Sequence, residues 1–225
     1  MRGNLNHVLA GLLLLAAGGC SREADPELAA RIECPRGTRP VERAYAHGRG
    51  IACALEDDTL HGPYRSWWLD GKKLSTGGFD RGKKHGSWRE WDRQGRLKYE
   101  GTYHRGTRHG AWTEYNQGRE WKRGTYREGK KHGRWIFFDE QGRKVFEGEY
   151  EVGKRHGPAV TWTPQGKRCT GSYRHGVKHG RWVCYHGRET DAVWTEGDYI
   201  HGKEQGRWNM YHPNGKLART GTYHM

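Results

Sequence analysis

One short phrase recurs at nearly constant spacing along most of this chain. It begins with His-Gly, and in most copies an aromatic residue stands two positions after the glycine. The copies begin at His61, His85, His109, His132, His156 and His179, and a Gln205-Gly206 variant closes the series. Successive copies are 24, 24, 23, 24, 23 and 26 residues apart. A period of this length predicts a stacked array in which each repeat covers its neighbour's apolar side, and it argues against a buried catalytic pocket.

Composition taken by itself would place the chain among disordered proteins. Leu, Ile, Val and Phe supply 29 of the 225 residues, and the formal net charge is +14, which is the disordered pattern. Against this, 11 Trp and 12 Tyr stand almost wholly at repeat positions. One such ring can bury roughly 150–250 Å². We therefore expect an ordered array with a thin core built from aromatic rings.

Within each repeat, glycine and aromatic residues alternate with a period of two on both sides of a six-residue loop. Examples are Gly101 and Tyr103 before the loop, and Gly110 and Trp112 after it. This alternation predicts antiparallel strands in which each ring lies over a glycine of the neighbouring strand. The predicted pairs are Gly101/Trp112 with Tyr103/Gly110, Gly77/Trp88 with Phe79/Gly86, Gly124/Trp135 with Tyr126/Gly133, Gly171/Trp182 with Tyr173/Gly180, and Gly197/Trp208 with Tyr199/Gly206. Ala159 replaces the Trp opposite Gly148, and we expect this repeat to be the weakest.

These features together predict an all-β fold. A turn at x-Gly, as at Gln94-Gly95 and Asn214-Gly215, joins the two strands of each repeat. Residues 61–225 should form an elongated single-sheet antiparallel meander of about seven hairpin repeats, with about fourteen strands spanning roughly 65 Å. Strand twist should curve the sheet into a shallow trough. The last strand, from Leu217 to His224, has no evident cap, so we also expect that its edge could pair in a dimer.

The N-terminus carries a targeting segment. An apolar run from Val8 to Ala17 follows Arg2 and is too short for a membrane span. The stretch Leu-Leu-Ala-Ala-Gly-Gly-Cys ending at Cys20 resembles the lipobox of bacterial lipoprotein signal peptides, with Ala17 departing from the usual Leu. The resemblance implies a signal peptide over 1–19, lipidation of Cys20, membrane attachment and a cell-envelope location. Ser21 implies the outer membrane. An ordinary cleaved secretory signal is the alternative. Residues 20–33 would be a linker and 34–60 an N-terminal cap.

The remaining four cysteines suggest two disulfides in an oxidising compartment. Cys34 and Cys53 bracket the irregular segment before the first repeat. Cys169 and Cys184 fall opposite one another in the strand register that pairs Gly171 with Trp182, so a cross-strand bond is geometrically reasonable. Two free buried thiols are the alternative for this second pair.

The histidines in register invite a metal site, but neighbouring repeats place them about 10 Å apart. Zinc requires ligands about 2 Å from one centre, so we assign these histidines to the junction between loop and strand. No Ser/His/Asp or Cys/His arrangement recurs, and phosphate loops and dinucleotide fingerprints are absent. We therefore predict no metal, no cofactor and no enzymatic activity.

Charge gathers in the loops that precede His-Gly or Gln-Gly. Thirteen basic residues stand there against Asp80, Glu128, Glu151 and Glu204, a net charge of +9. These basic residues are Arg81, Lys83, Lys84, Arg105, Arg108, Arg127, Lys130, Lys131, Lys154, Arg155, Arg174, Lys178 and Lys203. They predict a basic rim along the array, which histidine protonation would enlarge. A solvated edge that keeps the sheet soluble is the alternative interpretation.

The run Tyr99-Glu-Gly-Thr-Tyr-His-Arg-Gly-Thr-Arg-His-Gly closely resembles the MORN repeat, Tyr-x-Gly-x-aromatic-x-x-Gly-x-x-His-Gly, and Phe146 to Gly157 matches as well. The Trp that follows resembles the MORN-variant proteins of the YwqK antitoxin type. This resemblance covers residues 61–225 and implies a β-hairpin array of the kind that serves as a membrane-associated or protein-binding scaffold.

Three functions follow as hypotheses. The first is a lipid-anchored envelope scaffold whose basic rim binds a protein, an anionic lipid or a polysaccharide; nucleic acid is disfavoured by the envelope location. The second is an antitoxin or immunity protein that binds a toxin through an aromatic face. That face would contain Trp88, Trp112, Trp135, Trp182 and Trp208. The third and weakest is an envelope enzyme.

Overall fold

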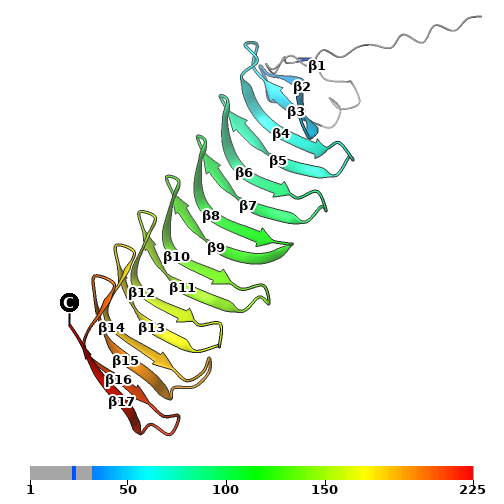
Figure 1. Ribbon diagram of the computed structural model, residues 1–225. Coiled ribbons are helices and arrows are strands. Elements are labelled where there is room, and N and C mark those ends of the chain that lie inside the picture. Colours follow the sequence, from blue (N-terminus) through cyan, green and yellow to red (C-terminus); the bar gives the residue numbers. More distant parts are fainter. Residues whose placement is uncertain (1–21, 24–31, 225) are drawn as a thin grey trace, which may run out of the picture.

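The protein is an elongated, single-sheet array of antiparallel strands (Figure 1). The computed structural model describes residues 22–23 and 32–224. The strands of this described part are β1 (Arg22–Glu23), β2 (Arg39–Tyr45), β3 (Gly48–Ala54), β4 (Leu60–Trp68), β5 (Lys73–Asp80), β6 (Lys83–Trp91), β7 (Leu97–His104), β8 (Thr107–Asn116), β9 (Arg119–Arg127), β10 (Lys130–Phe138), β11 (Lys144–Glu151), β12 (Lys154–Trp162), β13 (Arg168–Arg174), β14 (Val177–Tyr185), β15 (Val193–Ile200), β16 (Lys203–Tyr211) and β17 (Leu217–Tyr223).

Each strand pairs with its neighbours in sequence, so the sheet is a meander from β1 to β17. Fourteen strands, β4 to β17, cover the repeat region, which confirms the predicted all-β fold. The predicted signal peptide 1–19, the lipidation site Cys20 and most of the linker 20–33 lie outside the described residues. Within the described part, no helix is long and apolar enough to cross a membrane.

Successive turns alternate between the two long edges of the sheet. Within the repeats, one edge, here called the narrow rim, has two-residue turns at Arg81-Gly82, Arg105-Gly106, Glu128-Gly129, Val152-Gly153, His175-Gly176 and His201-Gly202. Both residues of each turn have positive φ, as a type I′ hairpin turn requires. The opposite edge, the wide rim, has longer turns such as 92–96 and 139–143, together with a two-residue turn at Gln117-Gly118. The six-residue loop predicted between Tyr103 and Gly110 was therefore wrong, because β8 already begins at Thr107.

The predicted Trp/Gly contacts are present. A Cβ added at Gly77, Gly101, Gly124, Gly171 or Gly197 would lie only 2.0–2.3 Å from ring atoms of the Trp on the following strand. A ring lying directly on a glycine leaves no space for any other residue there. The alternation of glycine and Trp in the sequence therefore follows from packing, because each Trp ring needs a residue without a side chain beneath it.

The predicted Tyr/Gly pairs on the same hairpins were wrong, because a β-bulge shifts the register. Gly101 lies opposite Trp112, but Tyr103 lies opposite Arg108 rather than Gly110. Gly110 has φ of 72°, and with Ala111 it forms the extra length in β8. The same shift separates the other predicted pairs, Phe79/Gly86, Tyr126/Gly133, Tyr173/Gly180 and Tyr199/Gly206. Each of these rings instead lies opposite a glycine of the preceding strand, as Tyr103 does with Gly86.

The segment between Cys34 and Cys53, expected to be irregular, is largely a regular hairpin of β2 and β3 that extends the sheet. Every residue from Ile51 to Ala54 is buried, so β3 is covered on both faces. Ile32 and the Cys34–Cys53 disulfide pack with Ile51 on one face, whereas Ala52 packs with Tyr64 on the other. The N-terminal end of the array is therefore capped, as repeat proteins require.

The second disulfide joins Cys169 to Cys184. These cysteines are direct partners on β13 and β14, as the register predicted. The bond ties two adjacent strands near the C-terminal end of the array.

Candidate functional site

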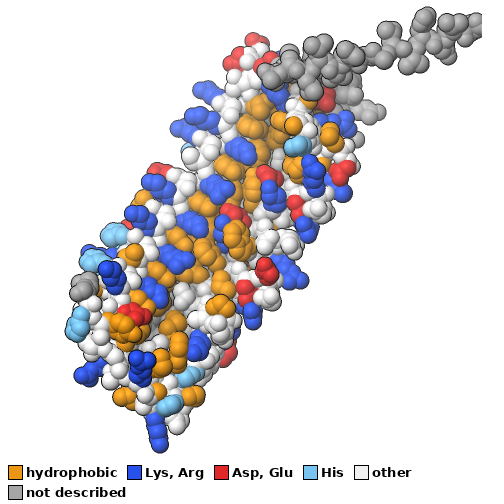
Figure 2. Space-filling view, in the orientation of Figure 1, with side chains coloured by type: hydrophobic (Ala, Val, Ile, Leu, Met, Phe, Trp, Pro, Cys, Tyr) orange, Lys and Arg blue, Asp and Glu red, His pale blue; other side chains and the backbone are white. Residues whose placement is uncertain are grey.

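A continuous row of aromatic rings, here called the aromatic stripe, runs along one face of the sheet. Its rings are Tyr64, Phe79, Trp88, Tyr103, Trp112, Tyr126, Trp135, Tyr150, Phe146, Tyr173, Trp182, Tyr199, Trp208 and Tyr223. Successive Tyr and Trp rings meet edge to face, for example Tyr126 and Trp135 with centroids 5.0 Å apart. This geometry is favoured by the quadrupoles of aromatic rings. An apolar band along the molecule is visible in Figure 2.

The stripe is a core rather than an open binding surface. Trp88, Trp112, Trp135 and Trp182 are at most 2% exposed, although no second layer of described residues covers this face. The rings bury one another, and the glycines beneath them let each ring lie flat on the backbone. Of the five Trp predicted to form an exposed aromatic face, only Trp208 is partly accessible.

The repeat expected to be weakest has a replacement for its missing Trp. At Gly148 an added Cβ would lie 2.7 Å from Ala159 Cβ and 2.9 Å from the ring of Phe146. Phe146 is 3% exposed and contacts both Tyr150 and Tyr173. The side chain that fills the gap therefore comes from β11 instead of β12, and the stripe stays continuous.

A regular row of cations lies over the stripe. Here called the cation row, it consists of Lys84, Arg108, Lys131, Arg155 and Lys178, each two residues before the bulge glycine of its strand. Lys84 Nζ lies 4.1 Å from the Trp88 ring centroid, and Lys178 Nζ lies 4.4 Å from that of Trp182. Arg155, whose strand has Ala159 at the position of the stripe Trp, lies 4.4 Å from the Phe146 ring. These distances are those of cation–π contacts.

Backbone hydrogen bonds fix the position of this row. In each case the turn glycine of one narrow-rim turn donates to a carbonyl in the preceding repeat. Gly106 N–H donates to the Lys84 carbonyl at 2.8 Å, and Gly153 N–H donates to the Lys131 carbonyl at 2.9 Å. The same bond recurs at Gly129, Gly176 and Gly202. The turns therefore hold the five cations at one regular interval along the array.

Burial and nearby charges tune the groups of the row. Burial lowers the pKa of Lys131 to about 8, and the neighbouring charge of Lys122 acts in the same direction. Burial also lowers the pKa of Lys178. Glu114 lies within the stripe and pairs with Lys122 at 2.9 Å and with Arg108 at 3.4 Å. Glu204 occupies the row's position on β16, where it accepts a hydrogen bond from Tyr199.

The predicted basic rim thus divides into two sets. The cation row packs over rings, while eight residues stand at the turns and strand ends of the narrow rim. These eight are Arg81, Lys83, Arg105, Arg127, Lys130, Lys154, Arg174 and Lys203, all exposed. The sequence prediction did not separate the two sets. A signal was present, because each cation-row residue directly precedes the His of the repeat phrase. On β16 the residue at that position is Glu204, before Gln205.

Within residues 61–225, the two rims differ strongly in charge. The narrow-rim segments there (80–84, 104–108, 127–131, 151–155, 174–178 and 200–204) hold thirteen Lys or Arg against four acids, a net +9, whereas the turn before the repeats on the same edge, 55–59, holds three acids. The wide-rim turns (69–72, 92–96, 117–118, 139–143, 163–167, 186–192 and 212–216) hold seven against six, a net +1. Wide-rim acids are also used locally: Asp139 accepts from the backbone of Gln141 and Arg143 and pairs with the Arg143 side chain.

The repeated histidines lie along the narrow rim without converging. His85 and His104 rings have centroids 5.3 Å apart, and His156 lies 3.4 Å from Glu151. Among the described residues, no group of three or more His, Cys, Asp or Glu side chains could hold a metal ion.

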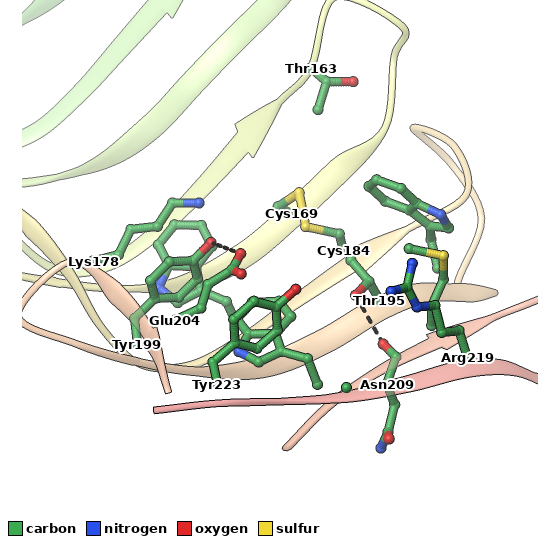
Figure 3. A pocket seen from close by; sticks show the side chains of 15 residues that line it. Thr163, Cys169, Lys178, Cys184, Thr195, Tyr199, Glu204, Asn209, Arg219 and Tyr223 are labelled. Atoms are coloured by element: carbon green, nitrogen blue, oxygen red, sulfur yellow. Dashed lines mark hydrogen bonds between the residues drawn. A yellow bond between two sulfur atoms is a disulfide. The ribbon is translucent and has the colours of Figure 1, made fainter. Parts of the chain in front are cut away.

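A cavity of about 390 Å³ opens at the C-terminal end of the stripe (Figure 3). Its wall includes the Cys169–Cys184 disulfide and the rings of Trp182, Trp194, Tyr199, Trp208 and Tyr223. Lys178, Glu204 and Arg219 supply its charges. The sequence analysis assigned none of these residues to a cavity. The last repeat has the same residue pattern as the interior repeats, and only the structure shows which strands lie beside it.

Comparison with known proteins bears on the repeat itself. A comparison with curated proteins gave no match. The family model of the MORN repeat variant matches residues 84–105 and 204–225. The first stretch holds most of β6, all of β7 and the wide-rim turn between them, and the second holds the equivalent β16 and β17. In both hairpins the Trp is the direct partner of a glycine. Over these two hairpins, the chain is similar to the MORN repeat variant family.

Proposed function

We propose that this protein is a non-enzymatic binding scaffold, anchored in the bacterial cell envelope through lipidated Cys20, whose narrow rim binds acidic envelope components. The observation that carries the proposal is the charge difference between the rims within residues 61–225, +9 against +1. MORN repeats form binding arrays and are generally non-enzymatic, which supports the same conclusion.

The exposed cations of the narrow rim are available to a ligand. Lys83, Lys130, Lys154 and Lys203 each begin a strand that follows a narrow-rim turn, and none forms an ion pair with a residue that the structure describes. Because the turns alternate, these ammonium groups recur along one long edge. An extended anionic surface would meet several of them at once, at roughly 1 kcal/mol per basic residue.

Binding to lipid vesicles tests the rim. The full chain carrying Cys20→Ser, which cannot be lipidated, would be mixed with vesicles containing anionic phosphatidylglycerol or only neutral phosphatidylcholine. We expect binding to the anionic vesicles that weakens steeply as salt rises. The double variant Lys83→Gln/Lys130→Gln should bind about 30-fold more weakly.

The matched control is Lys72→Gln/Lys216→Gln, which removes two exposed charges from the wide rim and should change binding much less. Equal losses in the two double variants, or binding that salt does not affect, would refute the rim proposal. Anchoring is tested separately by mass spectrometry of the envelope protein: an unmodified N-terminus beyond residue 20 would refute it.

The alternative, a toxin-neutralising protein that uses an exposed aromatic face, has less support because the stripe is buried. A partner that co-purifies with the chain from intact envelopes and stays bound at high salt would favour this alternative.

A further inference from the structure

Strand β17 has the residue pattern of an interior strand, but no strand of the described residues lies beyond it. Strands β5, β7, β9, β13 and β15 each carry a glycine that bears a Trp from the following strand. β11 carries Gly148, which is covered by Ala159 and Phe146. β17 carries the seventh glycine of this series, Gly221, and an added Cβ there would meet only one atom within 4 Å, a Tyr223 ring carbon at 3.9 Å.

Nothing within the described chain explains a glycine at this position. Gly221 does not have positive φ, so its backbone accepts any residue. Its neighbour Trp208 lies on Gly197 instead, with ring atoms 2.2–2.3 Å from a Cβ built there. Gly221 therefore leaves open a site of the kind that a Trp fills in five other repeats.

The side chains beside Gly221 on β17 are also more exposed than their counterparts on interior strands. In the interior, the following strand's Trp packs edge to face on the preceding Tyr, as Trp182 does on Tyr173 at 5.3 Å, and Tyr173 is 7% exposed. Tyr223 lacks that partner and is 46% exposed, and Leu217 on the same strand is 56% exposed. The cavity of about 390 Å³ lies directly beside Gly221 and Tyr223, with room for an added indole.

We propose that β17 accepts an antiparallel β-strand from another protein, which places a Trp on Gly221 and an acidic residue opposite Arg219. The interior strands supply the pattern of this partner. In β8, Trp112 lies opposite Gly101 while Glu114 lies opposite Tyr99, two residues further on each strand. Arg219 is two residues from Gly221 on β17 and forms no ion pair with a described residue. A Trp-x-Glu strand would therefore match both positions by backbone pairing and charge.

A second copy of the chain fits this edge poorly. β17 carries no Trp, so antiparallel self-pairing places no indole on Gly221. Centred on Thr220, it would set Arg219 of the copy opposite Gly221, and centred on Thr222 it would set Tyr223 there. The strands that carry a Trp are already paired on both sides. The other free edge, β2, is partly covered by β1 at Val41 and Glu42.

A peptide copied from β8, Thr-Arg-His-Gly-Ala-Trp-Thr-Glu-Tyr-Asn, tests the proposal. Labelled with fluorescein, it would be titrated with the full chain and followed by fluorescence anisotropy. We expect saturable binding, weakened about tenfold or more by Gly221→Ala in the protein or by Ala in place of the peptide's Trp. Thr222→Val, on the opposite face of β17, is the matched control and should change the affinity less than about twofold.

Gly221→Ala should fold normally because its Cβ meets no close neighbour, and circular dichroism would verify this. The proposal is overturned if the β8 peptide does not bind, or if Gly221→Ala and the Trp-free peptide leave the affinity unchanged. Sedimentation of the chain alone measures self-association. A dimer that is lost in Gly221→Ala would show that a second copy binds this edge, and it would refute the proposal of a different partner protein. The rim cations are untouched by these variants, so the result is independent of the vesicle experiment.

Discussion

Adding a single methyl group beneath a stripe Trp should destabilise the array measurably. In Gly124→Ala, the new Cβ would lie 2.3 Å from Trp135 Cδ2 and 2.4 Å from Cε2, so the ring must retreat by about 1 Å or more to reach ordinary contact. Trp135 is fully buried, and its Nε1–H donates to the Thr125 carbonyl at 3.0 Å. Overpacking costs about 1–3 kcal/mol, and a strained or lost buried hydrogen bond adds about 1 kcal/mol. We expect the free energy of unfolding to fall by about 2–4 kcal/mol.

The assay is urea unfolding followed by circular dichroism, with amide hydrogen exchange in β9 and β10 because repeat arrays can open locally. Gly221→Ala is the matched control: it makes the same change at the equivalent repeat position with no ring above it, and it should shift the stability by less than about 0.5 kcal/mol.

A double-mutant cycle sharpens the test. Trp135→Ala alone should cost about 3–5 kcal/mol, and adding Gly124→Ala to it should cost nothing further, because the ring that clashed is gone. Equal stability of the Gly124→Ala and Gly221→Ala chains, or additive costs in the cycle, would refute the claim that the glycine exists to receive the ring.

Two further predictions concern the cation row and the Phe146 replacement. Because burial lowers the pKa of Lys131 to about 8, below the ordinary lysine value of about 10.4, the folded state binds fewer protons between these values, so the stability from this group should rise with pH there. Thermal melts at pH 7.5 and 9.5 should show this rise in the native chain and less of it in Lys131→Met; an identical rise in both would contradict the assignment. Ala159→Trp should destabilise the native chain by about 1–3 kcal/mol, because Phe146 already lies over Gly148. In a Phe146→Ala background the same substitution should be stabilising, and urea unfolding that shows a gain in both backgrounds would disprove the replacement.

Local alternation carried most of the fold prediction. Strand residues i and i+2 share a face, so the glycine and Trp positions could be paired from the sequence alone, and so could Cys169 with Cys184. The Tyr/Gly pairs failed because the pairing rule assumed an unbroken ladder. The bulge at Gly110 adds two residues on only one side of β8, and a glycine in the sequence does not reveal on which side the ladder will shift.

The sequence by itself determined the period, the all-β meander, the Trp/Gly contacts and the basic character of one edge, since each depends only on spacing along the chain. Only the tertiary structure decided which basic residues cover rings and which face solvent, because neighbours such as Lys83 and Lys84 differ in environment but not in charge. It also decided that Phe146 replaces the missing Trp, and that β17 ends the sheet with Gly221 uncovered. These features depend on which side chains the adjacent strand places over a given position. The sequence of one repeat does not specify those side chains.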